Sequence, residues 1–234
     1  MNPITSAVKT HLDLSANIPL KIALYQALRK TIILREIPAG ARINEKEIAL
    51  ELNISRTPIR YALQELVKEK LVEHIPQKGI VVKGISQEDA YEIFAIRKAL
   101  DTLATTNAMY KMTPEDFDEM KALLHEGEAH SKAGNIDAVI KNFSDFNNLI
   151  YGKSQMIRLR EIVVELQSYL GYFRRLSISS PQRRDKALEE HWIIYRGMRN
   201  KDIDQITLIT HEHLNRSLEF ILEEMDRMDQ ANAK

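Results

Sequence analysis

Apolar residues recur every three or four positions along most of the chain, a spacing typical of amphipathic α-helices. In the first part, this pattern predicts helices over residues 18–36, 44–53 and 55–70. Two β-branched stretches at residues 71–75 and 79–83 then flank a short break and predict a β-hairpin. Three short helices followed by a hairpin are the layout of a winged helix-turn-helix.

The remainder of the chain shows the helical pattern with almost no strand pattern. Breakers such as Gly134 and Pro181 and capping residues such as Thr113 and Asp202 divide it into six helices. They are predicted over residues 86–110, 114–132, 136–151, 155–177, 182–199 and 203–228. The predicted fold is therefore mostly α: a winged helix-turn-helix of three helices plus a β-hairpin wing at residues 1–84, then an all-α six-helix bundle at residues 85–234.

Charge is distributed unevenly between these two parts. The 234 residues carry 33 basic and 33 acidic side chains, yet residues 1–83 hold 13 Lys and Arg against 8 Asp and Glu. A basic module suits double-stranded DNA, because phosphate binding depends on Lys and Arg. A difference of this size also arises on ordinary protein surfaces, so charge alone does not establish a nucleic-acid partner.

The composition excludes several classes of protein. Cysteine is absent, which rules out disulfide frameworks, zinc fingers and thiol nucleophiles. No apolar run approaches the roughly 18 residues that a membrane helix needs. The first residues also lack the basic-then-apolar order of a signal peptide. We therefore expect a cytoplasmic protein with no membrane partner.

Short hydrogen-bond donors and two arginines gather at the start of the third predicted helix. Ser55, Arg56, Thr57 and Arg60 lie there, and the arginines are one turn apart on the same face. In a helix-turn-helix, the N-terminal residues of the recognition helix meet base edges and phosphates, which Arg and hydroxyl groups bind well. The alternative is that Ser55 and Thr57 only cap the helix and that both arginines only face solvent.

Four helices of the second part each place one polar residue on an otherwise apolar face. These residues are Arg97, Asn147, His191 and His213. Burying such groups without partners costs on the order of several kcal/mol each, so we expect them to share a ligand. A divalent metal ion together with a carboxylate would satisfy all four. Two alternatives stay open: Arg97 pairs with Asp101 one turn later, and each histidine is a hydrogen-bonded core residue.

Other chemistry-bearing residues of the second part carry weaker signals. His125, His130 and His211 fall off the apolar faces of their helices, so they are expected at the surface. Trp192, the only tryptophan, is expected to serve in packing or in a dimer contact.

Residues 20–83 contain Pro38-Ala39-Gly40 and the run NEKEIALELNISRTPIRYALQELVKEKLVEHIPQKGIVV. This segment resembles the DNA-binding domain of the GntR family of bacterial transcription regulators. The resemblance implies DNA contacts by Lys46, Arg56 and Arg60, and a wing tip at Lys78 and Gly79 that reaches the minor groove. Tyr61 departs from the family, which commonly has Glu there.

Residues 86–225 carry looser motifs: AIRKALD at 95–101, DFN at 145–147, and Glu-His pairs at 190–191 and 212–213. They resemble the all-helical FCD domain, which binds effectors and mediates dimerisation in the FadR-type subfamily. Metal-containing members use an Asp, a His four residues later and two downstream histidines. The matching positions are Phe143, Asn147, His191 and His213, so the resemblance implies a weakened zinc or nickel site at Asn147, His191 and His213. A metal-free effector pocket is the alternative.

Within the family, the whole chain most resembles activators of citrate fermentation operons. This resemblance implies a small organic acid, such as citrate, as the effector. Its carboxylates would supply negative charge to Arg97 and the oxygen ligands that Phe143 and Asn147 no longer provide.

The leading hypothesis is a homodimeric, ligand-responsive transcription regulator that binds a double-stranded DNA operator and is not an enzyme. One alternative is a metal-dependent all-helical hydrolase built on His191 and His213. It lacks a clear general base, because Glu190 and Glu212 each neighbour a histidine and are expected to point away from the site. Another alternative is a helical scaffold whose basic part binds a protein. Whether the regulator activates or represses stays open.

Overall fold

The computed structural model describes residues 2–15 and 17–232, and this chain divides into two compact units. The N-terminal unit extends to Ser86 and includes the end of the chain from Met225 on, and the helical unit is Gln87–Glu224. The sequence prediction placed the boundary after residue 84 and assigned the whole last helix to the second part. In the described residues, no helix is both long and apolar enough to cross a membrane.

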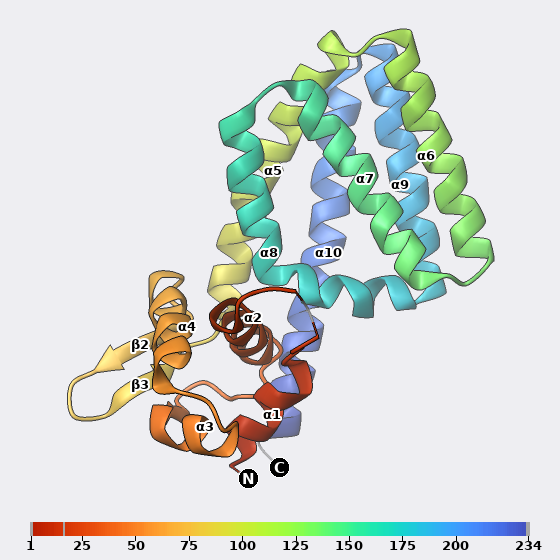
Figure 1. Cartoon of the computed structure of the whole chain (residues 1–234). Helices are drawn as coiled ribbons and strands as arrows, with labels where there is room; N and C mark the ends of the chain where they lie inside the picture. Colours follow the sequence, from red (N-terminus) through yellow and green to blue (C-terminus); the bar gives the residue numbers. More distant parts are fainter. Residues whose placement is uncertain (1, 16, 233–234) are drawn as a thin grey trace. The chain divides into compact units, whose positions relative to one another are not determined.

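The N-terminal unit combines short helices with a small sheet (Figure 1). Its helices are α1 (Pro3–His11), α2 (Leu20–Ile33), α3 (Glu45–Glu51) and α4 (Arg56–Lys68), and its strands are β1 (Arg42–Ile43), β2 (Val72–Ile75) and β3 (Gly79–Val82). The α2, α3 and α4 helices and the β2–β3 hairpin confirm the predicted winged helix-turn-helix.

Helices α2 and α4 supply most of the core of this unit. Leu24 and Leu28 of α2 and Ile59 and Leu66 of α4 are completely buried. Burying one such side chain stabilises the fold by about 2 kcal/mol. Because these residues fix the inner face of α4, they also fix which residues the helix presents to solvent.

The sequence patterns did not predict α1 or β1. Asn2 caps α1, since its side-chain oxygen accepts a hydrogen bond from the Ile4 amide, and Thr5 and Val8 are buried. The Asn2 amide also donates to Glu47 of α3 at 2.7 Å. Strand β1 has two residues, too few for alternation to be visible in the sequence.

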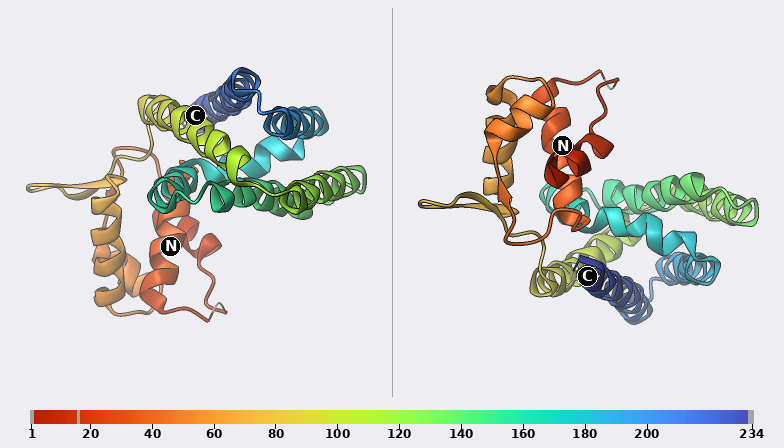
Figure 2. Two further views of the ribbon diagram at one scale, coloured as in Figure 1. Left: turned by 90° about the horizontal axis from the view of Figure 1, so that it is seen from above. Right: turned by 90° about the horizontal axis from the view of Figure 1, so that it is seen from below.

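The sheet has the strand order β1-β3-β2, and both strand pairs are antiparallel. Arg42 of β1 pairs with Val81, and Ile75 of β2 pairs with Gly79. The β2–β3 hairpin projects away from the helices of its unit in Figure 1 and in both views of Figure 2. The wing tip is thus an extended, solvent-facing element.

The helical unit is an all-α bundle, which Figure 2 views roughly along its helices. The helices are α5 (Gln87–Lys111), α6 (Pro114–Lys132), α7 (Ile136–Ser154), α8 (Ile157–Ser179), α9 (Pro181–Asn200) and α10 (Ile203–Asn232), whose last residues belong to the N-terminal unit. They confirm the six predicted helices. Thr113 forms a capping box with Asp116, and Asp202 accepts a hydrogen bond from the Gln205 amide, as the sequence indicated.

Close helix packing fills the interior of this unit. Met120, Phe146, Met198 and Ile206 belong to one buried cluster formed by α5, α6, α7, α9 and α10. At Gly127 of α6, an added Cβ would lie only 2.6 Å from Oδ1 of the buried Asn142 on α7. Glycine is therefore required there for α6 and α7 to approach.

Candidate DNA-facing surface and effector cavity

Arg56 and Arg60 occupy the exposed face at the start of α4. Both donate to one oxygen, Glu45 Oε2 on α3, at 2.8 Å and 3.0 Å. Burial of Glu45 acts to raise its pKa, but the two guanidinium groups outweigh it and hold the pKa of this carboxyl below its usual range. Glu45 thus orients two arginines side by side, with 42% and 55% of their side chains exposed.

The other predicted DNA contacts on these helices also face solvent. Lys46, Ser55 and Thr57 are exposed. Ser55 is the N-cap of α4 by position, but its side chain makes no capping hydrogen bond. The structure therefore gives Ser55 no role as a side-chain cap.

The wing tip is a tight turn that requires glycine. Gln77 and Gly79 have φ values of 67° and 85°, and Lys78 between them is exposed. A Cβ at Gly79 would lie 3.8 Å from Arg42 Nε, so the Arg42 guanidinium is beside the tip. Sequence reasoning missed Arg42, because only the pairing of β1 with β3 brings it to the wing.

Tyr61, where the chain departs from the family pattern, has a local partner. Lys21 Nζ of α2 lies 4.4 Å from the centre of the Tyr61 ring, a cation–π contact. The aromatic ring therefore links α4 to α2.

In the helical unit, the four inward polar residues come together at one cavity of about 120 Å³. Arg97 belongs to α5, Asn147 to α7, His191 to α9 and His213 to α10. Apolar side chains such as Phe143 complete part of the lining. The periodicity that predicted four inward residues therefore located a real cavity.

Arg97 is paired, as one alternative anticipated. It donates through Nη2 to Asp101 Oδ2 at 2.9 Å, and Tyr151 Oη donates to the other Asp101 oxygen at 2.8 Å. Burial, with the adjacent Asp101 charge, raises the pKa of Tyr151, so the hydroxyl stays protonated and available as a donor. Asp101 thus neutralises Arg97, although Arg97 Nε is buried without a hydrogen-bond partner among the described residues.

The position of Glu190 shows that one sequence prediction was wrong. Glu190 does not point away from the site: its side chain is completely buried, and Oε2 lies 2.5 Å from His213 Nδ1. Arg216 Nε donates to the other oxygen at 2.8 Å. Burial alone raises the pKa of Glu190, but His213 and then Arg216 lower it below its usual range. Glu190 faces the interior because His213 and Arg216 of α10 supply its hydrogen-bond partners there.

His191 lies in an aromatic sandwich. Its ring stacks on Phe146 with centroids 4.5 Å apart, and Phe143 meets it edge-on at 4.7 Å. Burial, and secondly the neighbouring charges of His213 and Arg174, lower the pKa of His191 well below its usual range. The imidazole is therefore neutral, and its Nδ1 has no hydrogen-bond partner in the described part of the chain.

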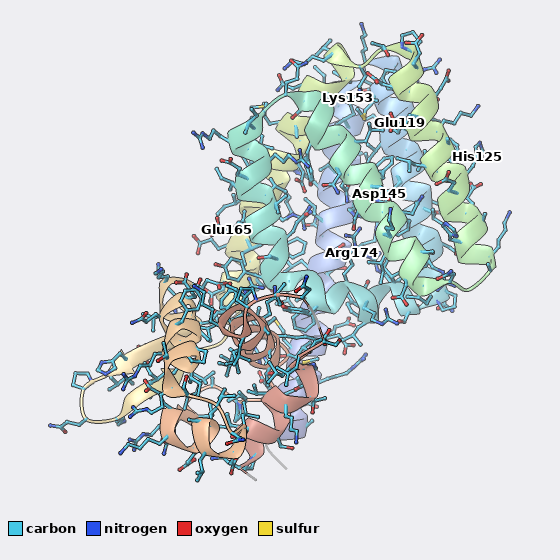
Figure 3. The ribbon with its side chains drawn as sticks, viewed as in Figure 1. Glu119, His125, Asp145, Lys153, Glu165 and Arg174 are labelled. Atoms are coloured by element: carbon cyan, nitrogen blue, oxygen red, sulfur yellow. The ribbon has the colours of Figure 1, made fainter. Side chains whose placement is uncertain are left out.

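Two arginines that sequence reasoning missed also line the cavity. Arg174 comes from α8 and Arg183 from the first turn of α9. The α8 ribbon changes direction along its course in Figure 1, and Figure 3 labels Arg174 on this helix. Burial, and secondly the charge of Arg97, lower the pKa of Arg174 to about 10; burial likewise lowers the pKa of Arg183.

The residues present do not fit a resident zinc or nickel ion. Phe143 places a hydrocarbon ring where the family pattern has a carboxylate, and Asn147 offers only an amide. Because His213 Nδ1 is hydrogen-bonded to Glu190, this ring can offer a metal only Nε2. Among the described residues, no group of three His, Asp or Glu side chains is arranged to hold a metal. Two imidazoles and an amide oxygen fall short of the ligand sets that these ions prefer.

The remaining candidates behave as ordinary residues. His125 is 58% exposed and lies on the outer side of α6 in Figure 3. His130 and His211 are half-buried rather than fully exposed. Trp192 packs against the buried cluster of α5, α6, α7, α9 and α10 and donates through Nε1 to Glu128 at 2.8 Å, as one of its two predicted roles requires.

Known proteins resemble the chain over both units. Residues 20–82 match the family described as bacterial regulatory proteins, gntR family, and residues 92–216 match the FCD domain. The uncharacterized HTH-type transcriptional regulator YdhC of Bacillus subtilis is 26% identical over 204 residues, which cover 87% of this chain and 91% of YdhC. The HTH-type transcriptional repressor RspR of Escherichia coli is 22% identical over 196 residues, covering 84% of this chain and 86% of RspR.

A solved structure shares the fold. That of E. coli McbR/YncC superimposes with a TM-score of 0.62 at 23% identity, covering 89% of this chain and 99% of that one. The relatives are transcription regulators, not enzymes, which removes the hydrolase alternative. The chain therefore belongs to the GntR family of bacterial transcription regulators, with a DNA-binding GntR domain followed by an FCD domain.

Proposed function

We propose that this regulator binds a palindromic operator as a homodimer and that a small organic acid in the helical unit changes its affinity for that operator. The lining of the cavity supports an anionic effector. Arg97, Arg174 and Arg183 contribute guanidinium groups, and no Asp or Glu of the described residues lines the cavity. A cationic cavity of this kind selects small anions. Citrate is the candidate that the sequence resemblance favours, and the FadR-type subfamily assignment rests on the same resemblance.

On the DNA side, we assign the reading of bases and phosphates to the start of α4 and to the wing. Arg56 and Arg60 are exposed and held side by side, and Ser55, Thr57 and Lys46 flank them. Lys78 and Gly79 form the wing tip. In a winged helix-turn-helix, these positions face the major groove and the neighbouring minor groove. A regulator of this kind acts where the chromosome is, which places it in the cytoplasm.

An apolar face of the helical unit supports the homodimer. Ile96, Leu103 and Tyr110 follow one another at seven-residue spacing along α5, and their exposed fractions are 40%, 44% and 58%. Seven residues make almost two helical turns, so the three side chains form one stripe. A second copy of the chain would cover this stripe, and a two-fold dimer matches a palindromic operator.

The test uses the full-length protein and a duplex selected by it from a random library. Fluorescence anisotropy should show sequence-specific binding whose affinity falls as salt rises, because phosphate contacts release counterions. Citrate, or another acid of a small panel, should shift this affinity. Operator affinity that no acid changes would refute the effector response.

A further inference from the structure

Two guanidinium groups at the cavity have no carboxylate within ion-pair distance among the described residues. Arg97 is neutralised by Asp101, whereas Arg174 and Arg183 form no ion pair with any described residue. Both line the cavity, to which the described residues contribute no Asp or Glu. Glu190 and Glu219 act on Arg183 only through space, without an ion pair, and no carboxylate acts on Arg174. The cavity lining therefore has an excess of positive charge, which an anion would offset.

These two side chains also have hydrogen-bond donors to spare. Arg174 donates through Nη1 to Ser144 Oγ at 2.9 Å. Arg183 reaches Ser217 Oγ at 3.4 Å through Nη2, while its Nε and Nη1 are buried without a partner among the described residues. A guanidinium offers five N–H donors in a planar fork that matches a carboxylate. Protein groups satisfy only a minority of them here.

We propose that Arg174 and Arg183 bind a small dicarboxylate or tricarboxylate directly, one carboxylate to each guanidinium, without a metal ion. This inference rests on the proposed function and adds to it two binding residues, a ligand charge of at least two and independence from metal. The ligand charge follows from the spare donors, because each of the two guanidinium groups can take one carboxylate.

The same balance argues against a bridging metal. A divalent ion would add two positive charges beside two guanidinium groups that already lack an ion-paired carboxylate. Phe143 withholds the carboxylate that would offset this charge, and its ring lies edge-on against His191 at 4.7 Å. Arg174 and Arg183 therefore bind the carboxylates directly, a role that a metal ion would otherwise serve.

The experiment is calorimetry on the full-length protein in the presence of EDTA, with citrate, succinate, the monocarboxylate gluconate and inorganic phosphate as probes. Arg174→Gln and Arg183→Gln are the test variants. Arg175→Gln is the matched control, because this neighbour is 60% exposed and pairs with Asp137. We expect citrate or succinate to bind without metal and each test variant to lose roughly tenfold to a hundredfold in affinity, with the control unchanged.

A second measurement separates ligand binding from a structural role. Because a half-buried guanidinium without an ion pair is unfavourable, each test variant should melt at a higher temperature than the wild type when no ligand is present. A structural arginine would show the opposite change. Lower melting temperatures together with unchanged citrate affinity would overturn the inference.

Four other outcomes would also overturn it: binding that EDTA abolishes, gluconate bound as tightly as citrate, phosphate bound in place of every carboxylate, or no carboxylate bound at all. The first two outcomes leave the proposed function standing, because a small organic acid still binds. The last two would refute an acid effector as well, whereas operator binding by the homodimer is decided separately by anisotropy.

Discussion

Replacing His191 by phenylalanine should remove a pH-dependent loss of stability from the helical unit. The side chain is 2% exposed, stacks on Phe146 and has no partner for Nδ1 in the described residues. Burial is the main cause of its lowered pKa, and the nearby charges of His213 and Arg174 add to it. Phenylalanine keeps an aromatic ring in the sandwich but cannot take up a proton.

The size of the effect follows from proton linkage. An unfolded histidine titrates near pH 6.5, so below that pH the unfolded chain binds a proton that the folded chain refuses. Stability is therefore retained above about pH 6.5 and lost as the pH falls toward the lowered folded pKa. Each pH unit crossed within that window costs about 1.4 kcal/mol. Carboxylates such as Glu190 contribute equally to wild type and variant, so they cancel in the difference.

Urea unfolding at about pH 7.5 and about pH 5.5, with EDTA present, measures this difference. The transition of the helical unit can be followed by the fluorescence of Trp192, the only tryptophan. The wild type should lose about 1.4 kcal/mol more than His191→Phe between the two conditions. His74→Phe, at an exposed side chain of β2, should keep the wild-type dependence. Equal pH dependence in wild type and His191→Phe would refute the buried neutral imidazole.

Three further changes test other parts of the chain. Arg60→Ala should weaken operator binding by about 1–3 kcal/mol in anisotropy without loss of folding. Lys68→Ala, at a side chain 70% exposed at the far end of α4, should leave operator affinity unchanged. Equal losses of affinity would show that the start of α4 does not read the operator. Leu103→Glu should convert the dimer to monomer in light scattering, and a dimer that persists would exclude the α5 stripe. Gly127→Ala should destabilise the helical unit by about 1–3 kcal/mol in urea unfolding, because the added Cβ meets a buried amide oxygen at 2.6 Å. Gly152→Ala, with open space around it, should stabilise α7 by up to about 1 kcal/mol. The reverse order of stability would contradict the packing argument.

Most helices could be predicted from the sequence because caps and breakers mark their ends. Thr113 and Asp202 make the capping hydrogen bonds that their positions indicated. Helix α1 was missed because its apolar face is short: Thr5 and Val8 are its buried residues, and α2 and α3 lie beyond the range of a local pattern. Strand β1 depends on pairing with β3, which no local pattern encodes.

The sequence predicted only some of the polar residues that line the cavity. The missed ones, Arg174 and Arg183, also lie on otherwise apolar helix faces. Val163, Leu170 and Ser177 mark the buried stripe of α8, and Arg174 lies on it, four residues after Leu170. Arg183 likewise precedes the buried Ala187 of α9 by one turn. Both are polar residues on apolar faces, the signal that identified Arg97. Arg174 was missed because the next residue, Arg175, is also an arginine and is exposed. Arg183 was missed because it lies two residues after Pro181, where the helix begins.

Glu190 shows why sequence spacing could not settle the chemistry of the cavity. Adjacent residues on a helix diverge by about 100°, so Glu190 and His191 cannot both face one central ligand. In the structure both are buried, because His191 packs against α7 and Glu190 meets His213 and Arg216 of α10. The carboxylate that a hydrolase would need as a base is thus hydrogen-bonded to His213 and Arg216. The cavity lining itself holds Arg97, Arg174 and Arg183 and no Asp or Glu of the described residues, which favours the binding of an anion over its chemical conversion.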